Sequence, residues 1–301
     1  MRPTVKATLM VLMVGLLSGC GDPRPESAPV PDRLDQATVD MITNTGAYPA
    51  RLYQVSLAAN AQAERCMRDA GIPWRGGVTK PNPNADEGGG VSVEWVRQHG
   101  YGMSDGTPSA GGQPEQPAGD DPRLRDTLLG PPAALAKLTA PNGVVYWYPR
   151  QGCAAKGHLA LYGDLDTWAR ITYFPQEISR DLFRRATADE RYQAALGRWR
   201  VCMAQYGYAY GAPDDVTAAL GKQYENSAEP LGQRKEKEIT IALRDVGCDR
   251  QAGLSKTGLE LRREFAQTIE PAQRAEMARL SGLFARAEER SGKLPRPSGS
   301  G

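Results

Sequence analysis

The chain has few of the residues on which most enzyme chemistry depends. It contains only two histidines, His99 and His158, and neither belongs to an H-E-x-x-H zinc string. An EF-hand loop and a phosphate-binding P-loop are also missing. Its cysteines stand alone, whereas structural zinc sites bring ligands in close C-x-x-C pairs. The sequence therefore predicts no cofactor and no metal site, and zinc binding by the cysteines is a disfavoured alternative.

An excess of charge of one sign is also lacking. The chain has 37 Lys and Arg against 35 Asp and Glu. Removing Arg2 and Lys6 with the leader described next makes the two signs equal. A neutral surface without clustered lysine or arginine offers no electrostatic footprint for nucleic acid or for anionic lipid. We therefore expect no nucleic-acid partner.

Long hydrophobic runs are missing except near the start of the chain. After a short basic start, the run Ala7–Leu17 is apolar, which is the layout of an export signal. It is shorter than the about 20 residues that a membrane-spanning helix needs. The run ends at Leu17-Ser18-Gly19-Cys20, which resembles the bacterial lipobox. That resemblance implies that the signal peptide, residues 1–19, is removed and that Cys20 carries lipid.

A lipid on Cys20 predicts a lipoprotein on the outer face of the bacterial cytoplasmic membrane. Two acyl chains hold a protein stably at a bilayer, whereas one chain binds only marginally. The expected membrane contact is therefore the lipid itself. The alternative is an ordinary secretory signal, in which Cys20 is incidental.

The remainder divides into a tether and two helical units. Residues 20–33 are rich in proline and predict an extended tether. The first unit, 34–187, contains a Gly/Pro-rich insertion at 76–122, and the second unit covers 188–291. Residues 292–301 are expected to form a disordered tail.

Apolar residues at helical spacing predict most of the elements. Helices are expected at Leu34–Ile42, Pro49–Ala70, Asp189–Tyr206, Ile239–Cys248, Thr257–Ile269 and Pro271–Arg290. The island Val91–Val96 is open to a helical turn or a strand. Asn142-Gly143 before Val144–Tyr148 predicts a turn and a strand. The fold class is therefore mainly α, with one short strand or hairpin.

A repeat is the most specific internal signal. Cys66-Met67 is followed by Gly71 and Trp74, and Cys202-Met203 is followed at the same distances by Gly207 and Tyr210. Each motif precedes a Gly-Cys pair, first Gly152-Cys153 and then Gly247-Cys248. The pattern predicts two related units.

The four cysteines beyond Cys20 are expected to form two disulfides, because nothing outside the membrane keeps thiols reduced. Three pairings are formally possible. The repeat favours Cys66 with Cys153 and Cys202 with Cys248, because duplicated units usually keep their disulfides internal. The fold prediction is therefore a pair of disulfide-stapled helical units.

Several strings together resemble a protein family. They are the lipobox, Trp199–Met203 ending at Gly207-Tyr208, Gly152-Cys153 leading to Leu161-Tyr162-Gly163, and Cys248 ahead of Gly253-Leu254. Over about residues 50 to 290 the chain resembles uncharacterised actinobacterial surface lipoproteins. The resemblance implies export, lipidation and a helical disulfide fold, and it assigns no chemistry to any residue. This chain departs from the family mainly in its long Gly/Pro-rich insertion.

One catalytic pattern occurs in the sequence. Gly102–Gly106 matches G-x-S-x-G, in which Ser104 is the nucleophile of a strand-to-helix elbow. Here Thr107-Pro108 and further glycines follow the serine, which is the wrong context for an elbow. The base would have to be His99 or His158, and a helix-surface or core position is favoured for His158.

Acidic and aromatic clusters have structural interpretations that we favour. The pairs Asp164/Asp166, Asp189/Glu190 and Asp214/Asp215 could serve acid–base chemistry. Asp164 and Asp189 stand before helical runs, where a carboxylate caps the helix. Tyr146-Trp147-Tyr148 could bind sugars or a protein, but a half-buried strand has the same pattern.

The sequence therefore favours a non-catalytic interaction or sensor module, with an envelope protein or cell-wall partner. Two alternatives remain open. A transporter-associated ligand-binding lipoprotein needs two α/β lobes and a cleft between them. An envelope hydrolase would use Ser104.

Overall fold

The computed structural model describes residues 31–81, 92–104, 121–225 and 228–294, which form eleven helices and one hairpin. The helices are α1 (Gln36–Thr43), α2 (Tyr48–Asp69), α3 (Val93–His99), α4 (Pro122–Leu129), α5 (Gly152–Tyr162), α6 (Leu165–Ala188), α7 (Glu190–Gln205), α8 (Pro213–Glu225), α9 (Leu231–Ala252), α10 (Leu254–Ala266) and α11 (Pro271–Lys293). The strands are β1 (Leu135–Thr139) and β2 (Val145–Pro149), paired antiparallel. The predicted mainly helical class is confirmed. The predicted signal peptide, Cys20, almost all of the predicted tether, much of the insertion and most of the predicted tail lie outside the described residues.

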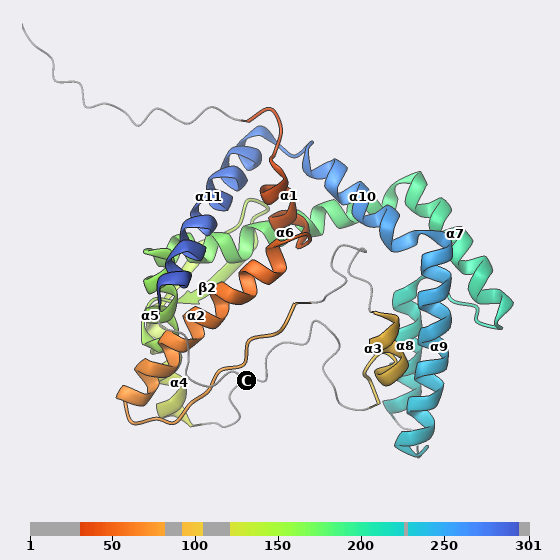
Figure 1. Cartoon of the computed structure of the whole chain (residues 1–301), viewed down its shortest axis with the longest axis horizontal. Coiled ribbons are helices and arrows are strands. Elements are labelled where there is room, and N and C mark those ends of the chain that lie inside the picture. Colours follow the sequence, from red (N-terminus) through yellow and green to blue (C-terminus); the bar gives the residue numbers. More distant parts are fainter. Residues whose placement is uncertain (1–30, 82–91, 105–120, 226–227, 295–301) are drawn as a thin grey trace, which may run out of the picture.

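The helices are arranged as an arch with two packed ends (Figure 1). One end, here named the α2 bundle, contains α1, α2, α4, α5, α6, α11 and the hairpin. The other end, here named the α9 bundle, contains α3, α7, α8 and α9. Across the top of the view, α10 packs against α6, α7 and α9 and so joins the two bundles.

The α2 bundle contains the larger apolar core. Val55 of α2, Leu161 of α5, Leu182 of α6 and Leu280 of α11 are completely buried in it. Burial of each such side chain contributes about 1.5–3 kcal/mol relative to exposure. The core therefore holds together helices that are separated by more than 200 positions in the chain.

The last helix joins this core although the sequence places it in the second unit. Met277 and Phe284 of α11 are buried against the helices of the first unit. Arg51 of α2 also donates two hydrogen bonds to Glu288 Oε2, at 2.9 and 2.6 Å. The apolar stripe of α11 is where the sequence predicts it, but the packing crosses the predicted boundary at residues 187 and 188.

A second, smaller core lies in the α9 bundle around Trp199, which is completely buried. The indole Nε1–H donates to Asp245 Oδ1 at 2.9 Å, and the Tyr101 hydroxyl donates to Asp245 Oδ2 at 2.8 Å. Burial raises the pKa of Asp245, and these two hydrogen bonds oppose the rise. Asp245 thereby ties α7 and the segment after α3 to α9.

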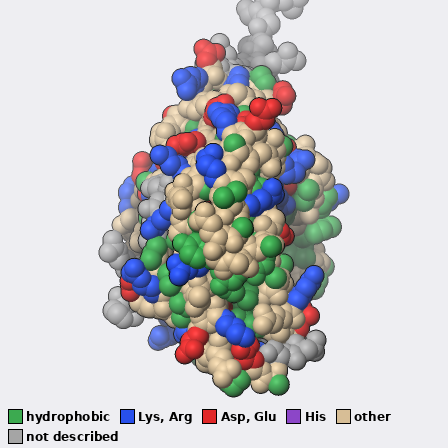
Figure 2. Space-filling model, turned by 90° about the vertical axis from the view of Figure 1, so that its right-hand side faces the viewer, with side chains coloured by type: hydrophobic (Ala, Val, Ile, Leu, Met, Phe, Trp, Pro, Cys, Tyr) green, Lys and Arg blue, Asp and Glu red, His purple; other side chains and the backbone are tan. Residues whose placement is uncertain are grey.

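The exposed side of this bundle carries both signs of charge. Figure 2 shows basic and acidic side chains interspersed over it, with hydrophobic side chains between them. This distribution agrees with the near balance of 37 basic and 35 acidic residues in the whole chain.

The repeated motif folds into the same helix end twice. The Ile72 N–H donates to the Met67 carbonyl at 2.9 Å, and the Tyr208 N–H donates to the Met203 carbonyl at 3.1 Å. Between donor and acceptor, Gly71 and its counterpart Gly207 have φ values of 74° and 84°. Glycine adopts this left-handed conformation without strain, which explains its place in both motifs.

The two Gly-Cys pairs, by contrast, are not equivalent. Gly152 begins α5 with a φ of 85°, and a Cβ there would lie 2.5 Å from the backbone nitrogen of Gly130. Gly247 lies inside α9 with open space around it. The two glycines are therefore not structurally equivalent, because only Gly152 is required by its backbone conformation and packing, although the cysteine after each glycine forms a disulfide with the Cys-Met motif of its own unit.

The disulfides join Cys66 to Cys153, linking α2 with α5, and Cys202 to Cys248, linking α7 with α9. These are the pairs that the repeat favours. Their Cα atoms are 5.5 and 5.6 Å apart, within the usual range for a disulfide. Such bonds persist in oxidising compartments, so they indicate an extracytoplasmic protein. Among the described helices, none combines the length and the apolar character of a membrane span.

The structure decides one element that the sequence left open and extends two others. The described part of the Val91–Val96 island is helical, because Ser92 caps α3 by accepting a hydrogen bond from the Trp95 N–H. The strand predicted at Val144–Tyr148 is β2, and it pairs with β1. The sequence pattern does not predict β1, because it does not distinguish that segment from the preceding loop. The helix predicted from Ile239 begins earlier, at Leu231, directly after Pro230.

Candidate functional site

Ser104 is buried at the end of the segment that follows α3, and its hydroxyl is occupied. Its Oγ donates to Glu238 Oε2 at 2.5 Å, and its backbone N–H donates to the same oxygen at 3.0 Å. The Met103 N–H donates to Glu238 Oε1 at 2.8 Å. Glu238 lies completely buried on α9. Ser104 therefore ties the segment after α3 to α9.

The surroundings of Ser104 differ from those of a nucleophile elbow. A helix, α3, precedes the serine where an elbow has a strand. His158 lies on α5 in the α2 bundle, at the opposite end of the arch from α3 (Figure 1). The ring of His99 packs beside Trp95, with centroids 4.9 Å apart. Ser104 and His158 thus cannot act together.

His158 is packed against an aromatic side chain. Its ring stacks on Trp168 with centroids 3.9 Å apart, and among the described residues its buried Nδ1 has no hydrogen-bond partner. Burial lowers the pKa of His158 to about 4, so the ring is neutral at pH 7. The structure assigns this histidine to packing rather than to proton transfer.

The acidic pairs serve mainly as helix caps and hydrogen-bond acceptors. Asp164 accepts the Thr167 N–H at 2.7 Å, and Asp189 accepts the Arg191 N–H at 2.9 Å, as their positions predict. Asp166 accepts the hydroxyl of Tyr148. In the part of the chain that the structure describes, no group of three or more His, Cys, Asp or Glu side chains is arranged to hold a metal ion.

The aromatic run on β2 divides between its two faces. Tyr146 stacks on Tyr173 of α6 with centroids 4.1 Å apart, and Tyr148 is buried. Trp147 points to the other face and is 60% exposed. Both tyrosines therefore pack as a half-buried strand requires, whereas the side chain of Trp147 is exposed to solvent.

The structure also forms a pocket of about 1130 Å³, here named the α6 pocket. It lies between α1, one wall of α6, the hairpin turn and the junction of α10 and α11. Its apolar lining includes Met41, Ile42, Ile171, Ile178 and Ile269, which are all buried. Among its described lining residues there is neither a histidine nor a cysteine. The pocket thus has the apolar lining of a binding site and no evident nucleophile–base pair.

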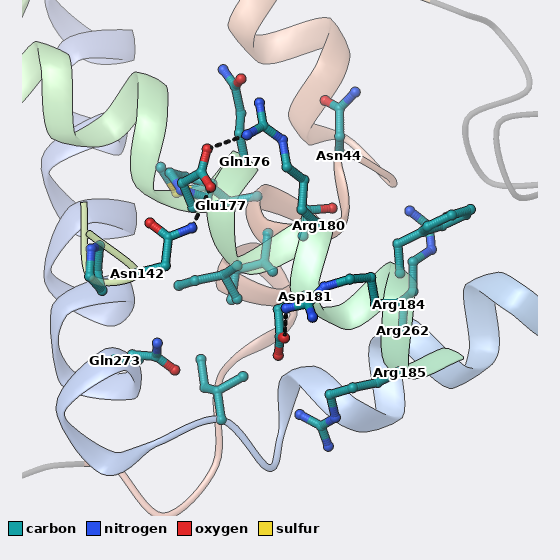
Figure 3. Close-up of a pocket in the computed structure, with 18 of the residues that line it drawn as sticks. Asn44, Asn142, Gln176, Glu177, Arg180, Asp181, Arg184, Arg185, Arg262 and Gln273 are labelled. Carbon is teal, nitrogen blue, oxygen red and sulfur yellow. Dashed lines mark hydrogen bonds and ion pairs between the residues drawn. The ribbon is translucent and has the colours of Figure 1, made fainter. Parts of the chain in front are cut away.

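Two acidic side chains of the pocket are already paired with arginines (Figure 3). Glu177 accepts from Asn142 Nδ2 at 2.6 Å and from Arg180 at 2.7 Å, and also from the hydroxyl of Tyr146. One turn further along α6, Arg184 donates to Asp181 at 2.6 Å. These pairs neutralise one another inside the pocket.

Two further arginines in the pocket have no carboxylate partner among the described residues. Arg185 donates to Thr268 Oγ1 at 2.8 Å and lies over the ring of Phe265, 4.6 Å from its centroid. Arg262 of α10 has no hydrogen bond or ion pair within the described residues, and burial lowers its pKa. The nearby charge of Arg263 lowers that pKa further. In Figure 3 the side chains of Arg185 and Arg262 extend from α6 and α10 in different directions.

Reasoning from the sequence did not identify this pocket. The available signal was weak, namely two adjacent arginine pairs, Arg184-Arg185 on one helix and Arg262-Arg263 on another. Helix-surface arginines are common, and only the packing of α10 against α6 places Arg262 in the lining of the same pocket as Arg184 and Arg185.

Comparisons with known proteins assign no function to the pocket. No protein-family model, curated protein or solved structure matches this chain. The resemblance to actinobacterial surface lipoproteins thus stays a prediction from the sequence.

Proposed function

We propose that this protein is a lipid-anchored, non-catalytic binding module of the bacterial envelope, which holds a ligand in the α6 pocket. The observation that carries the proposal is the pocket itself, whose volume of about 1130 Å³ and buried apolar lining suit a small molecule. Ligand sites are typically concave and mostly apolar, with a few polar groups that orient the ligand. The pocket has buried apolar residues of this kind, and it is more polar than such a site because most of its described lining residues are polar or charged.

The extracytoplasmic setting of the proposal rests on two independent observations. The two disulfides favour an oxidising compartment. The Leu17–Cys20 string favours lipidation, and Cys20 lies outside the described residues. The transporter-associated alternative calls for two α/β lobes, whereas the described residues form helical bundles with one hairpin.

A bulky side chain at an exposed lining residue should block the pocket and so test the proposal. Gln176 of α6 lines the pocket and donates only to the Thr172 carbonyl, at 2.7 Å. We expect Gln176→Trp to leave the stability of the free protein within ~0.5 kcal/mol. We also expect it to abolish thermal stabilisation by envelope small molecules. In the wild-type chain, a ligand at 100 times its Kd stabilises by about 2.7 kcal/mol.

The control is Arg286→Trp, at an exposed position of α11 that does not line the pocket. The chain is purified from the membrane fraction of a bacterial host, where retention that depends on Cys20 tests the anchor. A stabilising compound that acts equally on Gln176→Trp, or the lack of any such compound, would contradict the proposed binding site.

Ser104 offers a separate test of the hydrolase alternative. Ser104→Ala removes a hydrogen bond to the buried Glu238 carboxylate, so we expect a stability loss of ~1.5–3 kcal/mol. Esterase and peptidase assays should show no activity that depends on this serine. An activity present in the wild type and lost in a folded Ser104→Ala protein would favour the hydrolase instead.

A further inference from the structure

Arg262 is an unusual cation because it is only partly exposed and lacks an opposite charge. Among the described residues no carboxylate, carbonyl or hydroxyl accepts a hydrogen bond from it, although its neighbour Arg263 reaches Thr45 Oγ1 at 3.0 Å. Removing a charged group from water is costly unless an opposite charge or hydrogen bonds compensate it. The fold therefore carries a cost that a bound anion would remove.

Arg185 adds a second positive group to the lining of the pocket. Its contacts with Thr268 and the Phe265 ring hold the side chain in place without neutralising it. Arginine presents its donors in a planar fork that matches the oxygens of a carboxylate or a phosphate. The fork of Arg262 has no acceptor among the described residues, so it is free to pair with an oxyanion in the pocket.

The rest of the pocket is not built for a free inorganic ion. Next to the arginines lie the buried aliphatic side chains of Ile178 and Ile269, and Phe183 is 53% exposed at the lining. The lining contains four arginines and three acids, and two of these acids, Glu177 and Asp181, are paired with arginines. The third, Glu270, is exposed at the start of α11. The unpaired positive charge is thus placed beside apolar surface.

We propose that the α6 pocket binds an amphipathic organic anion, whose carboxylate or phosphate head pairs with Arg262 and whose apolar body lies on the aliphatic lining. This inference rests on the proposed function, because it names the ligand class of the same pocket. A neutral ligand would fill the lining but leave Arg262 without an opposite charge.

Calorimetric titration of the full chain with four probes tests the ligand class. The probes are decanoate, decyl phosphate, decanol and inorganic phosphate, each below its aggregation threshold. We expect decanoate or decyl phosphate to bind at least tenfold more tightly than decanol, and inorganic phosphate to bind more weakly than either anion. The ratio of the two amphipathic anions distinguishes a carboxylate from a phosphate head.

Arg262→Gln is expected to weaken binding of the preferred anion at least tenfold and to leave decanol binding unchanged. Arg262→Lys, which keeps the charge but not the fork, should lie between the wild type and the glutamine variant. The matched control is Arg286→Gln, at the exposed α11 position outside the pocket. The free Arg262→Gln protein should melt at or above the wild-type temperature, because the variant no longer buries an unpaired cation. A purely structural role for Arg262 predicts a lower melting temperature.

The outcomes separate this inference from the proposed function. Decanol binding as tightly as decanoate, and being lost in Gln176→Trp, would overturn the anion inference and retain the pocket as a binding site. Anion binding that is unchanged in Arg262→Gln would overturn the inference too. Failure of all four probes to bind overturns the inference, while stabilisation by another envelope compound that Gln176→Trp abolishes would still support the proposed function.

Discussion

Replacing Cys202 and Cys248 together by alanine is expected to lower the free energy of unfolding of the α9 bundle by about 4 kcal/mol. The disulfide joins α7 to α9 across a sequence separation of 46 residues, and its removal restores the loop entropy of the unfolded chain. The bundle depends on this constraint because its apolar core is smaller than that of the α2 bundle. Urea unfolding followed by circular dichroism measures the change.

Hydrogen exchange locates the effect of this substitution. Amide protection in α7 and α9 should fall, while protection in α2 and α5 is retained by the Cys66–Cys153 bond. The double alanine variant of that other pair is the matched control and should reverse the pattern. Unchanged exchange in α7 and α9 would mean that the second core holds these helices without the disulfide.

Replacing Trp199 by alanine is expected to cost 3–5 kcal/mol, because it leaves a large cavity at the centre of the second core. It also removes the indole N–H that donates to Asp245, leaving the Tyr101 hydroxyl as the remaining donor described for that carboxylate. The pKa of Asp245, already raised by burial, should therefore rise further in any variant that stays folded.

Trp147→Ala is the matched control for this prediction. Trp147 is 60% exposed on β2, so its truncation should change the free energy of unfolding by less than ~0.5 kcal/mol. Trp199→Phe should lie between the two alanine variants, since it keeps an aromatic ring and loses only the hydrogen bond and part of the volume. Equal effects of the two alanine substitutions in thermal unfolding would contradict the role assigned to Trp199.

The candidate site was the least predictable part of the molecule. The notable cation of the pocket is Arg262, and its distinguishing property is the lack of a carboxylate partner among the described residues. No residue nearby in sequence reveals that property, because α10 approaches α6 only in the folded bundle. Ser104 shows the converse case. Its motif suggested a nucleophile, and the tertiary contact with Glu238, 134 positions away, turned it into an anchor for the segment after α3.

The sequence by itself determined the features that depend on neighbouring residues. Helical spacing located most of the long helices, and the Cys-Met motif with its glycine specified the same left-handed helix end at Gly71 and Gly207. The even number of cysteines and their repeat also indicated the two disulfide pairs that the structure contains. These signals are local, or follow the order of the chain.

The tertiary structure alone decided which helices share a core and where the α6 pocket forms. The apolar stripe of α11 could have packed within the second unit, but its burial against α2, α5 and α6 completes the larger core. That choice places the junction of α10 and α11 against α1 and α6 and so creates the α6 pocket. An apolar stripe predicts only that a helix face is buried. The hydrophobic effect is non-directional, so the stripe does not specify which helix will cover that face.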